Sequence, residues 1–211
     1  MLHDPEEWVR DSAIISLTRM VGPQFPFGSR AEPMPAVVKA AIPLLLEVLA
    51  GSQMTHGRSF QVASTLAEIG GDHPDVVPVM LKILKESTDH SQRGSIVSAL
   101  GRLAGRIRGD EKVKQIVQAL ADAIENDTNN VVRLRAAAFL GYLGPRAKTA
   151  LPVLKKAEND ADPSVAKNAR EAVERIEGRS DEGDPGHVSS PERLKKPRER
   201  APEQPPQPEQ R

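Results

Sequence analysis

Five basic residues within one short stretch of the sequence offer the clearest chemistry in the chain. They lie in the segment GRLAGRIRGDEKVKQ and are Arg102, Arg106, Arg108, Lys112 and Lys114. Such clusters bind phosphate groups, which supply most of the affinity of nucleic-acid-binding proteins, and Arg133 and Arg135 are expected nearby. Asp110 and Glu111 interrupt the cluster. The stretch therefore predicts either a nucleic-acid contact or a solvated turn whose charges are partly neutralised.

Histidines at two corresponding positions, His56 and His90, are the other residues that could bind a ligand. Zinc requires ligand atoms within about 2 Å of the metal, whereas neighbouring helices pack roughly 10 Å apart. We therefore expect solvent-facing histidines and no metal. The sequence contains no nucleophile–base motif, no glycine-rich phosphate loop and no two histidines four residues apart. It predicts no catalytic residue and no cofactor, and hence a protein that is not an enzyme.

Composition narrows the classes of partner further. The 211 residues include 29 Lys and Arg and 29 Asp and Glu, so the net charge is zero. This balance gives no overall electrostatic field toward nucleic acid or an anionic membrane. The chain has 0 cysteines, which excludes disulfides, and 3% aromatic residues, which leaves few platforms for stacking. Without an apolar run of transmembrane length or a signal-peptide pattern, a cytoplasmic protein without membrane contact is expected.

One helical signature recurs between residues 1 and 178 and must position these side chains. It consists of a β-branched residue, a small residue, two large apolar residues and a closing glycine. The clearest example is Val132, Ala136, Leu140, Leu143 and Gly144. Because residues three and four apart lie on one side of a helix, the spacing predicts an amphipathic helix. The glycine is expected to end it in a left-handed conformation.

The signature appears five times, with its third position at Leu17, Leu66, Leu100, Leu140 and Val173. The intervals of about 33 to 49 residues match α-solenoid repeats made of two helices. The other closing glycines are Gly22, Gly70, Gly105 and Gly178. A first helix is predicted before four of these helices, over 36–49, 75–86, 111–125 and 146–158. The chain starts in a second helix, so the first repeat is expected to be incomplete.

The repeats predict an all-α protein with two regions. Residues 1–178 are expected to form a right-handed α-solenoid of about four and a half helix pairs. An insertion at 22–35 carries four prolines, which exclude a helix and lengthen the first interval. Residues 179–211 are rich in Pro, Glu, Arg and Gln and poor in large apolar residues. This tail is predicted to be disordered, since it cannot bury enough surface to offset its ordering entropy.

Several segments resemble the HEAT-repeat family, including shorter variants related to phycobilisome-lyase repeats. Those similar to the second HEAT helix are DPEEWVRDSAIISL, NNVVRLRAAAFLGYLG and DADPSVAKNAREAVERI, and AKTALPVLKKAENDADPSV resembles a first helix and turn. Ser59 stands where the family usually has Arg, and Gln92 replaces the usual Val. The resemblance covers residues 1–178. It implies a protein-binding scaffold, while a minority of the family bind nucleic acid or act in attaching bilin chromophores.

The resemblance also implies a ladder of ion pairs between repeats. Arg10, Arg93 and Arg133 occupy one repeat position. The aspartates near enough in sequence to pair with them are Asp4, Asp89 and Asp127. A planar guanidinium suits such pairing because it can donate two parallel hydrogen bonds to a carboxylate. We expect these arginines to be structural.

The second helices are expected to line the concave side of the solenoid. Positions opposite the buried stripe follow from a rotation of 100° per residue, and in the middle repeats they are mostly small. The predicted binding residues are Phe60, Ser98, Arg102, Leu134, Ala138 and Tyr142. Such a surface would accept a helix or extended peptide. Alternatively, the small residues pack neighbouring repeats together.

Three functions follow from these patterns. The first is a non-catalytic scaffold that binds a protein or peptide in the concave groove. The second is a nucleic-acid-binding module that uses the basic turn 102–114. The third, an accessory or lyase-like subunit, follows from the family resemblance. The oligomeric state is left open.

Overall fold

The structure is a computed structural model that describes residue 16 and residues 40–51, 56–71 and 73–178. Within these ranges the chain is helical with short turns, and no strand occurs. The all-α prediction is therefore confirmed for the described residues. Three predictions fall outside them: the first helix with Arg10 and Leu17, the insertion 22–35, and the tail 179–211.

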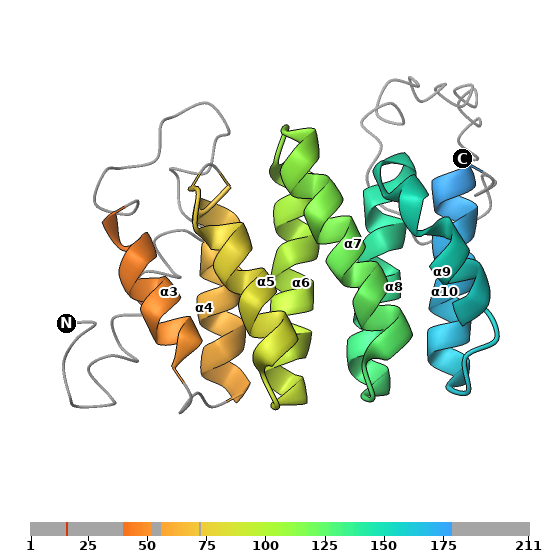
Figure 1. Cartoon of the computed structure of the whole chain (residues 1–211), viewed down its shortest axis with the longest axis horizontal. Helices are drawn as coiled ribbons and strands as arrows, with labels where there is room; N and C mark the ends of the chain where they lie inside the picture. Colours follow the sequence, from red (N-terminus) through yellow and green to blue (C-terminus); the bar gives the residue numbers. More distant parts are fainter. Residues whose placement is uncertain (1–15, 17–39, 52–55, 72, 179–211) are drawn as a thin grey trace, which may run out of the picture. The chain divides into compact units, whose positions relative to one another are not determined.

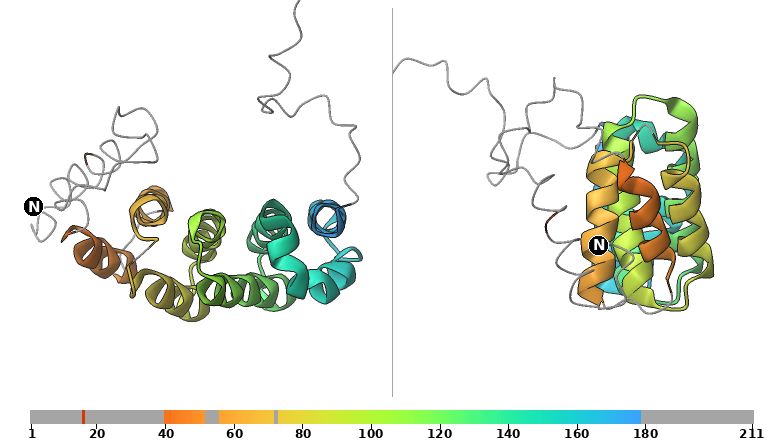
Figure 2. Two further views of the ribbon diagram at one scale, coloured as in Figure 1. Left: turned by 90° about the horizontal axis from the view of Figure 1, so that it is seen from above. Right: turned by 90° about the vertical axis from the view of Figure 1, so that its left-hand side faces the viewer.

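The described helices form two rows of neighbours (Figures 1 and 2). The second-helix row contains α4 (His56–Ile69), α6 (His90–Arg106), α8 (Asn130–Leu143) and α10 (Pro163–Glu177). The first-helix row contains α3 (Ile42–Ala50), α5 (Val76–Glu86), α7 (Asp110–Asn126), the 3₁₀ helix η1 (Gly144–Ala150) and α9 (Leu151–Ala157). Each helix contacts its neighbours along the row and a partner in the other row.

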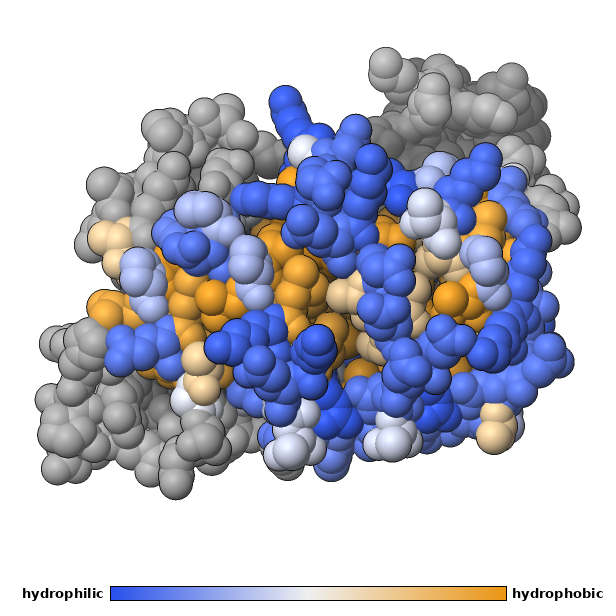
Figure 3. All heavy atoms as spheres, in the orientation of Figure 1, coloured by the Kyte–Doolittle hydropathy of each residue, from blue (hydrophilic) through white to orange (hydrophobic). Residues whose placement is uncertain are grey.

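The core lies between the two rows, where the predicted stripe is buried. Leu66, Leu100 and Leu140 are fully buried, and Val173 is nearly so. Met80 of α5 and the apolar side of α7 cover them from the first-helix row. Full burial of a Leu side chain stabilises a fold by about 1.5–3 kcal/mol. On the solvent side of the first-helix row, apolar surface appears between charged ridges (Figure 3).

The helix ends are set by side-chain caps and glycines, though not always as expected. Asn129 and Asp162 accept hydrogen bonds from the first backbone N–H groups of α8 and α10. Gly178 ends α10 in the left-handed conformation, with φ 72°. The same prediction is wrong for Gly70, which follows α4 without a positive φ, and for Gly144, whose φ of 56° is combined with a ψ of -135°. It is also wrong for Gly105, because this glycine lies within α6, which continues to Arg106. A Cβ at Gly105 would lie 2.9 Å from the Tyr142 ring, so close packing explains the glycine.

The predicted helix 146–158 is also corrected. Residues 144–150 form the 3₁₀ helix η1, and the α-helix spans only Leu151–Ala157. A continuous α-helix would need the N–H of residue 152 to donate to the carbonyl of Lys148. Pro152 has no N–H, and the N–H of Leu151 donates to that carbonyl instead. Among the described residues, no helix combines the length and apolar character needed to cross a membrane.

Candidate functional site

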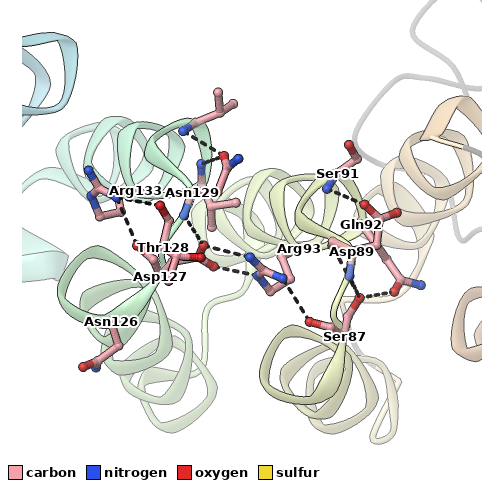
Figure 4. Close-up of polar contacts among 12 residues, drawn as sticks. Ser87, Asp89, Ser91, Gln92, Arg93, Asn126, Asp127, Thr128, Asn129 and Arg133 are labelled. Carbon is pink, nitrogen blue, oxygen red and sulfur yellow. Dashed lines mark hydrogen bonds and ion pairs between the residues drawn. The ribbon is translucent and has the colours of Figure 1, made fainter. Parts of the chain in front are cut away.

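The arginine–aspartate ladder joins successive turns of the second-helix row. Arg93 donates from Nε and Nη2 to the carboxylate of Asp127, at 2.7 and 2.9 Å, and from Nη1 to the carbonyl of Ser87 (Figure 4). Arg133 repeats this arrangement, with two bonds of 2.9 Å to Asp160 and one of 3.1 Å to the carbonyl of Asp127. Each arginine thus links its own turn to the next one.

The electrostatics of the ladder favour its charged forms. Hydrogen bonds to the aspartates raise the pKa values of Arg93 and Arg133. Burial alone would raise the pKa of Asp127, but hydrogen bonds from Arg93 and the Asn129 N–H outweigh burial and lower it. The hydrogen bond from Arg133 lowers the pKa of Asp160. The ladder is therefore a satisfied structural feature, as predicted for Asp127.

The predicted set of aspartates needs two corrections. Asp89 is not the ion-pair partner of Arg93; it caps the start of α6 by accepting the N–H of Ser91. Sequence reasoning missed Asp160. It lies two residues before the N-cap of α10, as Asp127 lies two residues before the N-cap of α8. Ser87 occupies the corresponding position after α5, just as Ser59 replaces the arginine in α4. Between α4 and the turn after α5, serines thus replace both the arginine and the aspartate of the ladder. The Ser59 hydroxyl is buried without a hydrogen-bond partner among the described residues.

Arg102 is in a different environment. Its Nη2 donates to the Ser64 hydroxyl at 2.7 Å, and its guanidinium lies 5.6 Å from the centre of the Phe60 ring. Its Nε is buried without a hydrogen-bond partner, and no described carboxylate forms an ion pair with it. Burial lowers the pKa of Arg102, Glu68 opposes this, and Arg106 adds to it. Arg102 is a partly desolvated cation that lacks a carboxylate partner within the described part of the chain.

Large apolar side chains are exposed on the solvent side of the same row as Arg102. Among the described residues, the exposed large hydrophobic side chains are Phe60 at 46%, Val131 at 46% and Tyr142 at 66%. All three belong to α4 or α8, on either side of α6. By helical phase they lie opposite the buried leucines, as Ser64 and Arg102 do. Sequence reasoning missed Val131, although the same phase rule would have found it.

We call this surface the α4/α6/α8 face. It consists of Phe60, Ser64, Glu68, Arg102, Arg106, Val131, Leu134, Arg135, Ala138 and Tyr142. Leu134 and Ala138 are half-buried within it. The face therefore contains five of the six binding residues predicted from the sequence.

The sixth, Ser98, does not lie on the surface. It is 7% exposed, and its hydroxyl donates to the Gly94 carbonyl. Gly101 is also buried. It packs closely against α8, since a Cβ at this position would lie 2.3 Å from Phe139. Phe139 in turn contacts Tyr142 edge to face. For these positions the packing alternative describes the structure: small residues let α6 and α8 approach closely.

The basic residues 102–114 are divided among several interactions. Arg106 pairs with Glu68, and Lys112 donates to the carbonyl of His73. Arg102 reaches toward α4, while Arg108 and Lys114 are exposed. Arg146, which sequence reasoning missed, donates to the carbonyls of Ala104 and Ile107 and so satisfies the C-terminal end of α6. No sequence pattern had connected Arg146 with this helix end.

A second surface feature lies in the first-helix row. A groove of about 1110 Å³ lies along α5 and α7. Apolar side chains line it together with polar and charged ones, as Figure 3 shows for this side of the molecule. The lining includes Leu81, Leu84, Lys114, Gln118, Ala119 and Asp122. Its charges are mixed, so it shows no preference for one sign of partner.

The described residues contain no group of three potential metal ligands. His90 is exposed at the first position of α6. Comparisons with known proteins add no assignment. No protein-family model matches the chain, and the search of curated proteins found no match. Any functional conclusion must therefore come from the geometry described above.

Proposed function

We propose that the repeats form a right-handed, HEAT-like α-solenoid of about four and a half helix pairs, which serves as a non-catalytic protein-binding scaffold. The alternation of the chain between two rows of neighbouring helices supports this architecture. In such a solenoid the second-helix row would line the concave side, and the α4/α6/α8 face would be the binding surface.

One observation carries the proposal. The exposed large hydrophobic residues of the described chain all lie on this face, together with Arg102, which lies over the Phe60 ring and has no carboxylate partner among the described residues. Phe, Tyr and Arg are the residue types enriched in protein interfaces, where a few of them supply most of the binding energy. The first-helix row has a groove but no exposed large anchor among the described residues.

The test is cross-linking capture by the full chain, followed by mass spectrometry. Phe60→Glu combined with Val131→Glu should leave the melting temperature nearly unchanged, because surface substitutions cost within about 0.5 kcal/mol. The variant should lose the proteins that the wild type captures. Gln118→Glu, in the groove of α5 and α7, is the matched control and should retain them. Loss of capture in the control alone would place binding in that groove and refute the proposal.

The nucleic-acid alternative has weaker support, since Arg106 and Lys112 are already engaged within the protein. Phosphate-driven binding would fall steeply between about 50 and 200 mM salt. Capture through an apolar face should change little over this range. The same capture experiment at two salt concentrations therefore separates the two functions.

A further inference from the structure

The charges of the second-helix row are distributed unevenly. Helices α6 and α8 contain no Asp or Glu, and their arginines are Arg93, Arg102, Arg106, Arg133 and Arg135. The ladder neutralises Arg93 and Arg133. The other three lie on the α4/α6/α8 face, and Glu68, which pairs with Arg106, is the acidic residue of that face. The face is therefore positively charged, although the whole chain is neutral.

This face carries both cationic and apolar groups. Arg102 lies over Phe60 between α4 and α6. Arg135 extends from α8 over Gly94 of α6, where its Nη1 would be 3.1 Å from an added Cβ. Val131 and Tyr142 belong to the same helix as Arg135, and both are exposed. An incoming group would thus meet both guanidinium groups and large apolar side chains.

Arg102 gives this face a specific preference. Its guanidinium has lost part of its hydration and lacks a carboxylate partner among the described residues. A charge in such a position gains more from an incoming anion than a fully hydrated charge does. Arg93 shows what a carboxylate does for an arginine of the same helix: the hydrogen bonds to Asp127 raise its pKa. A carboxylate brought by a partner would complete Arg102 similarly.

We infer that the α4/α6/α8 face binds an acidic segment of another protein, in which Asp or Glu residues alternate with large apolar residues. The inference rests on the proposed scaffold function. Carboxylates of the segment pair with Arg102 and Arg135, while its apolar side chains cover Phe60 on α4 and either Val131 or Tyr142 on α8, which lie about 16 Å apart along that helix. Helices packed about 10 Å apart place α4 and α8 roughly 20 Å apart. About six residues of extended peptide span this distance.

A nucleic acid fits the same face less well. A protein that makes about six to ten phosphate contacts binds with a strong dependence on salt, whereas this face offers Arg102 and Arg135 without carboxylate partners among the described residues. Phe60 and Tyr142 offer two exposed rings on which a base can stack, but Val131, Leu134 and Ala138 are aliphatic and offer none. Alternating carboxylates and apolar groups match both kinds of side chain present. The comparison with an oligonucleotide is therefore one arm of the test.

The experiment uses the full chain and a displayed library of random 12-residue peptides. Wild-type protein should enrich peptides with acidic residues next to aromatic or aliphatic ones. Synthetic copies of the enriched peptides should bind the Arg102→Gln/Arg135→Gln variant about tenfold more weakly or worse. Lys82→Gln/Lys148→Gln, which removes two charges from the first-helix row, is the matched control and should stay within about twofold of the wild type. Arg135→Gln alone serves if the double variant does not fold.

Three outcomes of the peptide experiment would overturn the inference. They are no enrichment, enrichment without an acidic preference, and equal affinity of the double arginine variant. Tighter, arginine-dependent binding of a 20-nucleotide oligo-dT than of any enriched peptide would also overturn it. Neutral or basic peptides that bind the wild type but not Phe60→Glu/Val131→Glu would leave the scaffold function standing and refute only its acidic partner. If neither the acidic preference nor the dependence of binding on Phe60 and Val131 is found, both proposals are refuted.

Discussion

Arg93 and Arg102 lie on the same helix but in opposite electrostatic situations. Arg93 donates two hydrogen bonds to Asp127 and one to a backbone carbonyl, and these bonds raise its pKa. Arg102 has a serine hydroxyl and an aromatic ring as its neighbours, and burial lowers its pKa. Arg93 is paired with a carboxylate within the fold, whereas Arg102 has no carboxylate partner among the described residues and can still bind one. Pairing, more than residue type, separates structural from functional arginines here.

The largest effect is expected from breaking the paired side of this comparison. Asp127→Ala removes the acceptor for Arg93 and for the Asn129 N–H. Because it leaves a largely buried guanidinium uncompensated, we expect a loss of about 3 kcal/mol in the free energy of unfolding. Urea denaturation would measure it. Asp122→Ala, an exposed aspartate of α7, is the control and should cost little; equal losses would show that the ladder has no special role.

A smaller loss in the free energy of unfolding is expected from disturbing the contact between α6 and α8 at Gly101. Gly101→Ala places a Cβ 2.3 Å from the Phe139 ring, which must move away from its packed position. Overpacking of this kind costs about 1–3 kcal/mol. Gly109→Ala, at the N-cap of α7, is the control for an added methyl group without a clash, since its Cβ would meet nothing closer than 3.9 Å. If both glycine variants melt at the wild-type temperature, the close approach of α6 and α8 is not required.

Acid should weaken the pairing of Arg93 with Asp127 and of Arg133 with Asp160. The pKa values of Asp127 and Asp160 lie below their ordinary value of 3.8 in the folded protein. Their stabilising contribution is therefore fully present above that pH and is lost as the pH falls through the folded-state values. Unfolding midpoints measured from neutral pH to below about pH 3 should fall less steeply for Asp127→Ala/Asp160→Ala than for the wild type. Parallel curves would contradict this assignment.

Much of the fold was predictable because its determinants are local. The spacing of Leu66, Leu100 and Leu140 identified helices and their buried sides, and the end at Gly178 followed from glycine's tolerance of a positive φ. Gly105 was misassigned because its role depends on Tyr142, a residue of the next repeat. Sequence patterns report local conformation well and contacts between repeats poorly.

The candidate site shows the same division. The phase rule placed Phe60, Arg102 and Tyr142 on one face, although the burial of Ser98 needed the distance between helices. Arg102 contacts Ser64 and Phe60 of α4 and no carboxylate among the described residues, which the sequence did not indicate. Asp160 was missed because Ala166 occupies the arginine position of its own repeat, so no arginine close to it in the sequence indicated a pair. These facts required three-dimensional placement.

The smallest effect on stability is expected from replacing Arg102, the arginine without a carboxylate partner among the described residues. Arg102→Met keeps most of the side-chain length but removes the desolvated charge and the unsatisfied Nε. The lost hydrogen bond to Ser64 and the contact with Phe60 are each worth about 1 kcal/mol, and relief of the desolvation offsets them. The free energy of unfolding should therefore stay within about 0.5 kcal/mol of the wild type. Arg93→Met should instead be strongly destabilising, because it leaves the Asp127 carboxylate uncompensated. Urea denaturation of the two variants side by side gives the decisive comparison: equal destabilisation would make Arg102 a structural residue and remove the unused cation on which the acidic partner depends.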